Sequence, residues 1–206
     1  MEKPAPTEFP IHELLRDRWS PRAFSERMVE PEKLHSVVEA ARWAPSSNNE
    51  QPWSIVMATK QDPDSYARLL NCLKEGNKKW AFRAPVLMLS VARMNFEDDG
   101  TSNRHAFHDT GMAVLALALQ ATALGLIVHQ MAGFDIEKAR IDLKIPSGHE
   151  PVAMIALGYP GDVAVLPDYL KQRELAPRQR KSTRDFVFDG LWGAALTTLG
   201  PVGDGR

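Results

Sequence analysis

The segment Ala44-Pro45-Ser46-Ser47-Asn48-Asn49-Glu50-Gln51-Pro52-Trp53 separates two patterns of secondary structure. Helical periodicity precedes it over residues 31–43, and an apolar run typical of a strand follows it over 53–59. Because proline fixes its own φ and disfavours helix in the residue before it, the two prolines predict a rigid, non-helical turn. Two hydroxyls and three amides lie between them, and such groups are costly to bury without partners. The turn is therefore either an ordinary helix-to-strand loop or one wall of a binding site.

Apolar residues recur at helix or strand spacing on both sides of this turn. Pro31 suits a first helical turn, and Asp135 has the position of a helix N-cap. Strands and helices in alternation predict an α+β or α/β layer architecture around one core. The predicted helices cover 11–18, 31–43, 62–73 and 105–124, and the predicted strands cover 53–59, 85–92 and 151–157, with shorter extended pieces at 126–128 and 186–188.

Two of these segments carry further expectations. The helix over 105–124 is apolar almost all round from Met112 to Leu124, and that apolar run is shorter than the roughly 20 apolar residues of a membrane span. We therefore expect a fully buried central helix. The polar, acidic stretch from Asn95 to Asn103 is expected to form a mobile loop or a lid.

The composition bounds the class of protein. Lys and Arg number 25 and Asp and Glu 26 among 206 residues, which argues against a nucleic-acid-binding surface or a membrane-surface protein. No apolar signal region opens the chain, so a cytoplasmic location is expected. The lone Cys72 excludes an intrachain disulfide and a cysteine metal cage. We expect one domain over residues 1–206, with its core at 11–188 and a peripheral tail at 189–206.

Three segments concentrate groups that can bind a ligand. The first is Arg18-Trp19-Ser20-Pro21-Arg22, where two guanidinium groups match phosphate oxygens in geometry and charge. The second is the 44–53 turn, and the third is Arg178-Gln179-Arg180-Lys181. Each also has a simpler interpretation, as surface arginines, a polar loop or a solvated basic face.

Other familiar sites are missing from the sequence. No Gly-x-Gly-x-x-Gly follows a strand, and no Walker motif or nucleophile elbow occurs. His105, His108 and Asp109 could suggest a metal, but no second ligand cluster completes a site, so none is expected.

Taken together and in order, the motifs resemble the flavin-dependent nitroreductase family. They are Arg18-x-Ser20-x-Arg22-x-Phe24, Ala44-Pro45-Ser46-Ser47-x-Asn49-x-Gln51-Pro52-Trp53, Asn77-x-x-Trp80, Asp109-x-Gly111-x-Ala113, Gly133-Phe134-Asp135, Ala156-Leu157-Gly158-Tyr159-Pro160 and Arg178-x-Arg180. The resemblance covers about residues 11–188. It implies a three-layer α+β fold with a central, mostly antiparallel sheet flanked by helices. It also implies a homodimer with FMN at the interface and C-terminal arms that reach onto the partner subunit.

The resemblance implies a set of cofactor-binding residues. The FMN phosphate and ribityl chain would lie against the loop with Arg18, Trp19, Ser20 and Arg22, joined by Arg178 and Arg180. The other subunit would contribute Pro45, Ser46, Ser47 and Asn49 to the flavin's edge and face. Asn77 would hydrogen-bond the pyrimidine side, and Gly133 would present its N–H near the reactive nitrogen.

The implied activity is hydride transfer from NADH or NADPH through flavin N5 to an electron-poor acceptor, by a ping-pong mechanism and without a catalytic protein residue. Alternatives are another reaction of reduced flavin (dehalogenation, enal reduction or flavin cleavage) and a flavin-binding protein without turnover. Trp80 replaces the family's lysine near the flavin, and Ala132 replaces an acidic residue. Both changes leave the expected substrate side less charged.

Overall fold

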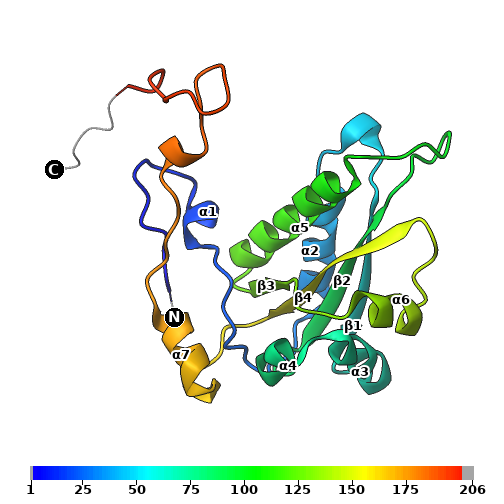
Figure 1. Cartoon of the computed structure of the whole chain (residues 1–206). Coiled ribbons are helices and arrows are strands. Elements are labelled where there is room, and N and C mark those ends of the chain that lie inside the picture. Colours follow the sequence, from blue (N-terminus) through cyan, green and yellow to red (C-terminus); the bar gives the residue numbers. More distant parts are fainter. Residues whose placement is uncertain (1, 201–206) are drawn as a thin grey trace.

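The computed structural model describes residues 2–200 and is built around one antiparallel sheet (Figure 1). Its strands lie in the order β1 (Trp53–Thr59), β2 (Val86–Arg93), β4 (His149–Gly158) and β3 (Ile127–Met131), and every neighbouring pair is antiparallel. The three predicted strands are confirmed, and the short extended segment at 126–128 belongs to the edge strand β3. The α+β class with an antiparallel sheet is thus confirmed.

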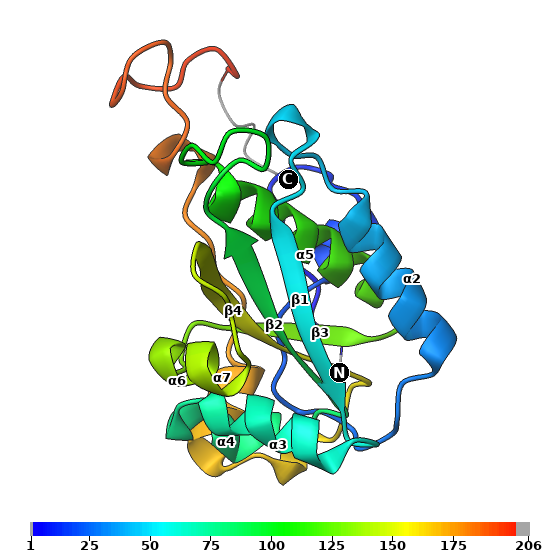
Figure 2. The same ribbon diagram turned by 90° about the vertical axis from the view of Figure 1, so that its right-hand side faces the viewer.

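Helices cover both faces of the sheet and make a three-layer structure (Figures 1 and 2). Strand β2 is buried on both faces because alternate residues face opposite layers. Its Leu87 and Leu89 belong to the core beneath α3 (Pro63–Cys72), α4 (Glu75–Ala81) and α6 (Ile136–Asp142). Its Val86 and Met88 belong to the core beneath α2 (Pro31–Arg42) and α5 (Ala106–Ala123).

Local signals begin these helices where the sequence predicts. Pro31 occupies the first turn of α2, where its missing N–H costs nothing. The Asp62 carboxylate accepts from Ser65 N (3.1 Å) at the start of α3. The Asp135 carboxylate accepts from Lys138 N (2.9 Å), which confirms the predicted N-cap of α6.

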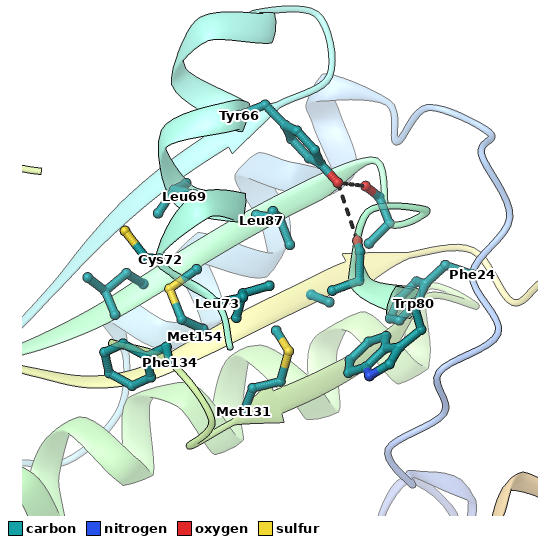
Figure 3. Packing of buried hydrophobic residues seen from close by; sticks show 14 of the residues in the cluster. Phe24, Tyr66, Leu69, Cys72, Leu73, Trp80, Leu87, Met131, Phe134 and Met154 are labelled. Atoms are coloured by element: carbon teal, nitrogen blue, oxygen red, sulfur yellow. Dashed lines mark hydrogen bonds between the residues drawn. The ribbon is translucent and has the colours of Figure 1, made fainter. Parts of the chain in front are cut away.

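The Tyr66 hydroxyl of α3 holds the end of α4 in place (Figure 3). It lies 3.3 Å from the carbonyl oxygen of Ala81, the last residue of α4, and 2.6 Å from Ala84 O beyond that helix. Burial raises the pKa of Tyr66, so the hydroxyl stays protonated and donates. Cys72 is fully buried in the same cluster, as expected.

Two expectations are wrong. Helix α5 is not buried all round, because Phe107 (48% exposed) and Leu115 (44%) face away from the sheet. The segment 186–188 is not a strand, since it stands on the C-terminal arm without a strand beside it. Within the 44–53 turn, Ser47–Asn49 forms the one-turn 3-10 element η1, in which Asn48 has non-helical φ and ψ. Within residues 2–200, no helix is both long and apolar enough to span a membrane.

The N-terminal segment and the C-terminal arm run side by side at the left of Figure 1. The first contains α1 (Glu13–Asp17), and the second contains η2 (Val163–Val165), α7 (Asp168–Leu175) and η3 (Thr183–Asp185). Lys3 Nζ donates to Glu174 O (2.6 Å), and Arg178 donates to Lys3 O (2.9 Å). These contacts join the two ends of the chain.

The segment after Arg22 approaches the exit of β4 backbone to backbone. Gly161 N donates to Ala23 O (2.7 Å), and Phe24 and Pro160 form an isolated antiparallel β-bridge. A Cβ on Gly161 would lie 2.5 Å from the Phe24 carbonyl carbon and 2.6 Å from Ser25 N. Only glycine allows this approach without a shift of the backbone.

We therefore expect Gly161→Ala to lower the free energy of unfolding by about 1–3 kcal/mol, because the added methyl overpacks two backbones. Chemical denaturation measures the change. Gly76→Ala is the matched control: nothing lies within 4 Å of that Cβ, and α4 should gain about 0.5–1 kcal/mol. Equal effects of the two substitutions would contradict the close-approach argument.

Candidate functional site

The loop Arg18–Arg22 leaves α1 in an extended conformation and is held by Arg178. The Arg178 guanidinium donates from Nη1 to Arg16 O (2.7 Å) and from Nη2 to Arg18 O (3.0 Å). It thereby satisfies carbonyls that the end of α1 leaves open. Arg178 thus supports the loop's backbone, and its role as a phosphate ligand stays a prediction.

Positive charge gathers at this loop. Burial first, and the Arg180 guanidinium next, lower the pKa of Arg18. Burial, Arg18 and Arg180 lower the pKa of Arg178 in the same way. Within residues 2–200, the Arg18 guanidinium forms neither a hydrogen bond nor an ion pair, although it is partly buried. Partly buried cations without an acceptor indicate a site for an anion.

The other residues of the loop differ in exposure. Trp19 is partly buried, and Lys3 Nζ lies 4.7 Å from its ring centroid. Ser20 is exposed, so its hydroxyl is open to a ligand. Arg22 is ion-paired at 3.6 Å with the buried carboxylate of Glu174.

Asn77 and Gly133 lie against each other. Asn77 Nδ2 donates to Gly133 O (3.0 Å), and Lys74 N donates to the same oxygen (3.0 Å). A Cβ on Gly133 would lie 2.6 Å from Asn77 Nδ2. The glycine therefore leaves room for the Asn77 amide between α4 and the segment that follows β3.

An aromatic stack joins the segments that carry Arg22, Asn77 and Gly133. The Trp80 ring is parallel to Phe24 (centroids 6.1 Å apart, 10° between planes) and lies 4.5 Å from the His129 ring. Figure 3 shows Trp80 beside Phe24 in the core. Trp80 is 1% exposed, so in this chain it is a core residue rather than a residue of the substrate surface.

His129 extends the stack to the Arg18–Arg22 loop. Its Nδ1 lies 2.9 Å from Pro21 O, and because a carbonyl can only accept, Nδ1 carries the proton. Burial, and next the nearby Arg22 cation, lower the pKa of His129 to about 4. The ring is therefore neutral at pH 7 and serves as a fixed donor.

The 44–53 turn is strained and largely open to solvent. Asn48, Asn49 and Gln51 have φ values of 53°, 56° and 49°, a region that non-glycine residues rarely occupy. Gln51 N donates to Ser46 Oγ (3.0 Å) and closes the turn. Pro45, Asn48 and Asn49 are exposed. Strained, exposed amides of this kind are typical of functional sites.

A buried carboxylate anchors the turn from α5. Asp109 lies in the first turn of that helix, is 2% exposed and accepts from Ser47 N at 3.0 Å. The helix N-terminus also stabilises its negative charge. In the sequence, Asp109 stands out only as part of a motif and beside two histidines. Its link to Ser47, 62 positions away, carries no local signal.

A second contact ties the turn to the segment 95–103. Arg93 forms ion pairs with Glu50 and Glu97 (both 2.7 Å), and Glu97 N donates to Glu50 Oε1 (2.7 Å). The segment itself is a small hairpin with a bridge between Asn95 and Ser102. A function as a lid stays a prediction.

One chain brings together only half of the predicted site. The segments that carry Arg22, Asn77 and Gly133 meet at the stack, and His129 joins the Arg18–Arg22 loop to it through Pro21 O, whereas the 44–53 turn lies beyond the Trp53 end of β1. Figures 1 and 2 both show the turn near one end of α5 and α4 at the opposite end of the molecule. Within residues 2–200, no group of three or more His, Cys, Asp or Glu side chains could hold a metal ion.

The neutral state of His129 predicts a pH dependence of stability. Between pH 6.5 and 4 the unfolded chain binds a proton that the folded ring does not, so stability is complete above pH 6.5 and is lost as the pH falls. From pH 7 to 4, wild type should lose up to about 3 kcal/mol more of its unfolding free energy than His129→Gln. Urea titrations at each pH measure this, with His35→Gln, at an exposed position, as control. Parallel pH profiles of wild type and His129→Gln would contradict the assignment.

Three known proteins are similar to this chain in sequence or structure. A crystal structure described as an oxidoreductase containing FMN superposes with a TM-score of 0.87 at 36% identity, over 92% of this chain and 96% of that one. Iodotyrosine deiodinase 1 of Mus musculus is 26% identical over 80% of this chain and 67% of its own length. A putative NADH dehydrogenase/NAD(P)H nitroreductase of Streptomyces coelicolor is 25% identical over 75% of this chain and 87% of its own.

The family model described as "Nitroreductase family" matches residues 15–75 and 62–159, well over half of the chain. The matched region holds the Arg18–Arg22 loop, the 44–53 turn, Asn77 and Gly133. This chain belongs to the nitroreductase family.

Proposed function

We propose that this protein is an FMN-dependent oxidoreductase that takes hydride from NADH or NADPH. The observation that carries the proposal is the partly buried Arg18 guanidinium, which has no acceptor among residues 2–200 and stands beside Arg178 and Arg180. A dianionic phosphate would satisfy this charge with bidentate, charge-assisted hydrogen bonds. The similar oxidoreductase is described as containing FMN, and the similar Streptomyces protein is named for NADH and NAD(P)H.

The residues present suit FMN at each of its parts. Arg18, Arg22 and Arg180 would hold the phosphate, with the Ser20 hydroxyl near the ribityl chain. The Asn77 amide would bond the polar edge of the ring, and the backbone at Gly133 would face the ring. Trp19 lies in the same loop and would border the cofactor. The reaction requires no general acid or base from the protein.

The chemistry that FMN supplies when bound is hydride exchange between a reduced nicotinamide and an electron-poor acceptor, such as a nitroaromatic or a quinone. The protein binds and orients the group and keeps water from its ring. Donor and acceptor would use one surface in turn, which predicts parallel initial-rate lines.

We further propose that the active form is a homodimer. Phe107 and Leu115 leave an apolar stripe exposed along α5, and Phe186 and Trp192 (94% exposed) do the same on the C-terminal arm. A second copy would cover these surfaces. The partner's turn, with Pro45, Ser46, Ser47 and Asn49, would then complete each site. One domain over the whole chain and a cytoplasmic location stay predictions.

The first test uses purified protein. FMN should bind and turn the sample yellow, and anaerobic NADH or NADPH should bleach it. Arg18→Ala should weaken FMN binding about tenfold to hundredfold, because it removes a charge-assisted hydrogen bond of roughly 1.5–3 kcal/mol. Arg42→Ala, on the outer face of α2 and paired with Glu39, is the matched control.

Each outcome separates the candidate functions. Protein that cannot be loaded with FMN would overturn the proposal. Protein that binds FMN yet stays yellow with both nicotinamides would be a flavin-binding protein without turnover. Unchanged affinity in Arg18→Ala would remove that residue from the phosphate site.

Mixing two variants tests the shared site. Arg18→Ala damages the loop, and Asn49→Gly removes an amide while keeping a φ that glycine tolerates. Each homodimer should bind FMN weakly. After unfolding and joint refolding, half of the dimers are mixed and hold one intact site, so about a quarter of the wild-type sites should return. No recovery would place the loop and the turn of one site in the same chain.

A second candidate is reductive dehalogenation, which the similarity to iodotyrosine deiodinase 1 favours. The same flavin site would then deliver reducing equivalents to a halogenated ring. Reduced protein mixed with a halogenated phenol should release halide and return to yellow. Reoxidation by a nitroaromatic or a quinone, without halide release from the phenol, would favour the first candidate.

A further inference from the structure

One charged side chain is completely buried beside the cationic loop. Glu174 lies on α7, and its side chain has no exposed area. Its Oε1 accepts from Arg22 N (2.6 Å) and Ala23 N (3.1 Å), about 150 positions earlier in the chain. Burying a carboxylate is costly, and these two amides offset part of the cost.

The second carboxylate oxygen of Glu174, Oε2, takes part in an ion pair but accepts no hydrogen bond from residues 2–200. Oε2 lies 3.6 Å from Arg22 Nη1, which is an ion pair but too long for a hydrogen bond. Among residues 2–200 it has no hydrogen-bond partner. The carboxylate is thus placed by the backbone of Arg22 and Ala23 rather than by a tight ion pair. The Arg22 guanidinium stays one-quarter exposed and available to another anion.

The arm holds this loop at both ends. Arg178 donates to Arg18 O at the start, Glu174 accepts from Arg22 N at the end, and His129 donates to Pro21 O from the sheet. Lys3 Nζ donates to Glu174 O (2.6 Å) and so fixes the backbone that carries the carboxylate. Backbone polar groups with these partners lose most of their freedom to move.

We propose that Glu174 is a positioning residue of the cofactor site. By accepting from the Arg22 and Ala23 amides, it sets the backbone direction from which Arg22 reaches the phosphate of the flavin. It also makes the site depend on the C-terminal arm. The inference rests on the proposed function, because it needs a phosphate at this loop. It goes beyond that function, since Glu174 is fully buried and would act through the backbone of Arg22 and Ala23.

A phosphate-directed role has a specific signature. FMN and riboflavin differ in the phosphate alone, so loss of the positioning should weaken FMN binding and spare riboflavin. Glu174→Ala leaves the part-buried Arg22 N–H and the buried Ala23 N–H without an acceptor and should raise the Kd for FMN about tenfold or more. The Kd for riboflavin should stay within about twofold. Glu174→Gln keeps an oxygen for both amides and should bind FMN nearly as wild type does.

Flavin fluorescence titrations measure both Kd values, and thermal unfolding checks that each variant is folded. Asp168→Ala is the matched control, since that carboxylate lies on the same helix and is 95% exposed. It should leave both affinities unchanged. If Glu174→Ala does not fold, Glu174→Asp replaces it, because the shorter side chain withdraws the carboxylate from the amides.

Three results would overturn the inference: wild-type FMN affinity in Glu174→Ala, equal weakening of FMN and riboflavin, or Glu174→Gln as weak as Glu174→Ala. Equal weakening would mean that Glu174 only stabilises the fold. Wild-type protein that binds no FMN would overturn the proposed function and this inference with it. Wild-type protein that binds FMN, with unaffected variants, would overturn this inference alone.

Discussion

The geometry of the half-site depends on the packing of Trp80 between Phe24 and His129. Phe24 follows Arg22 by two residues, Trp80 follows Asn77 by three, and His129 precedes Gly133 by four. Rings in a close-packed core have few alternative arrangements, so the segments that carry them cannot move independently. The neutral His129 ring adds a hydrogen bond to Pro21 O, which couples the loop to the sheet. A replacement of Trp80 that shifts the stack would therefore disturb several parts of the site together.

Repulsion between positive charges near the Arg18–Arg22 loop disfavours the folded arrangement of this region. The chain as a whole has a formal charge of −1, yet four arginines (Arg18, Arg22, Arg178 and Arg180) gather beside Lys3, with Glu174 the one buried carboxylate among them. Burial and mutual repulsion make such cations unfavourable, and an anion would reverse the sign of that interaction. Binding of a phosphate group at this loop would thus raise the free energy of unfolding of the protein.

The single chain has a strained turn, exposed amide groups and exposed apolar side chains. The 44–53 turn holds three non-glycine residues at positive φ, and its Asn48 and Asn49 side chains face solvent. Strain of order 1 kcal/mol at each such residue persists only where surrounding contacts impose it. The outer side of α5 and the C-terminal arm expose apolar side chains as well. The strain, the open amides and the apolar surfaces all agree with a site that two subunits complete.

Elements whose signals lie in neighbouring residues could be predicted from the sequence. The strands at 53–59, 85–92 and 151–157, the first turn of α2 at Pro31 and the Asp135 cap are confirmed, whereas the apolar residues at 186–188 form no strand. Helix α4 was not predicted, because it is short and contains Gly76 and Asn77. Helix α7 was not predicted either, because it buries little more than Leu170 and Glu174. Which distant groups meet depends on tertiary packing, as at the Asp109 carboxylate beside the turn and the Glu174 carboxylate beside the loop. A buried polar contact between residues far apart leaves no periodic pattern, because it depends on how complete elements pack.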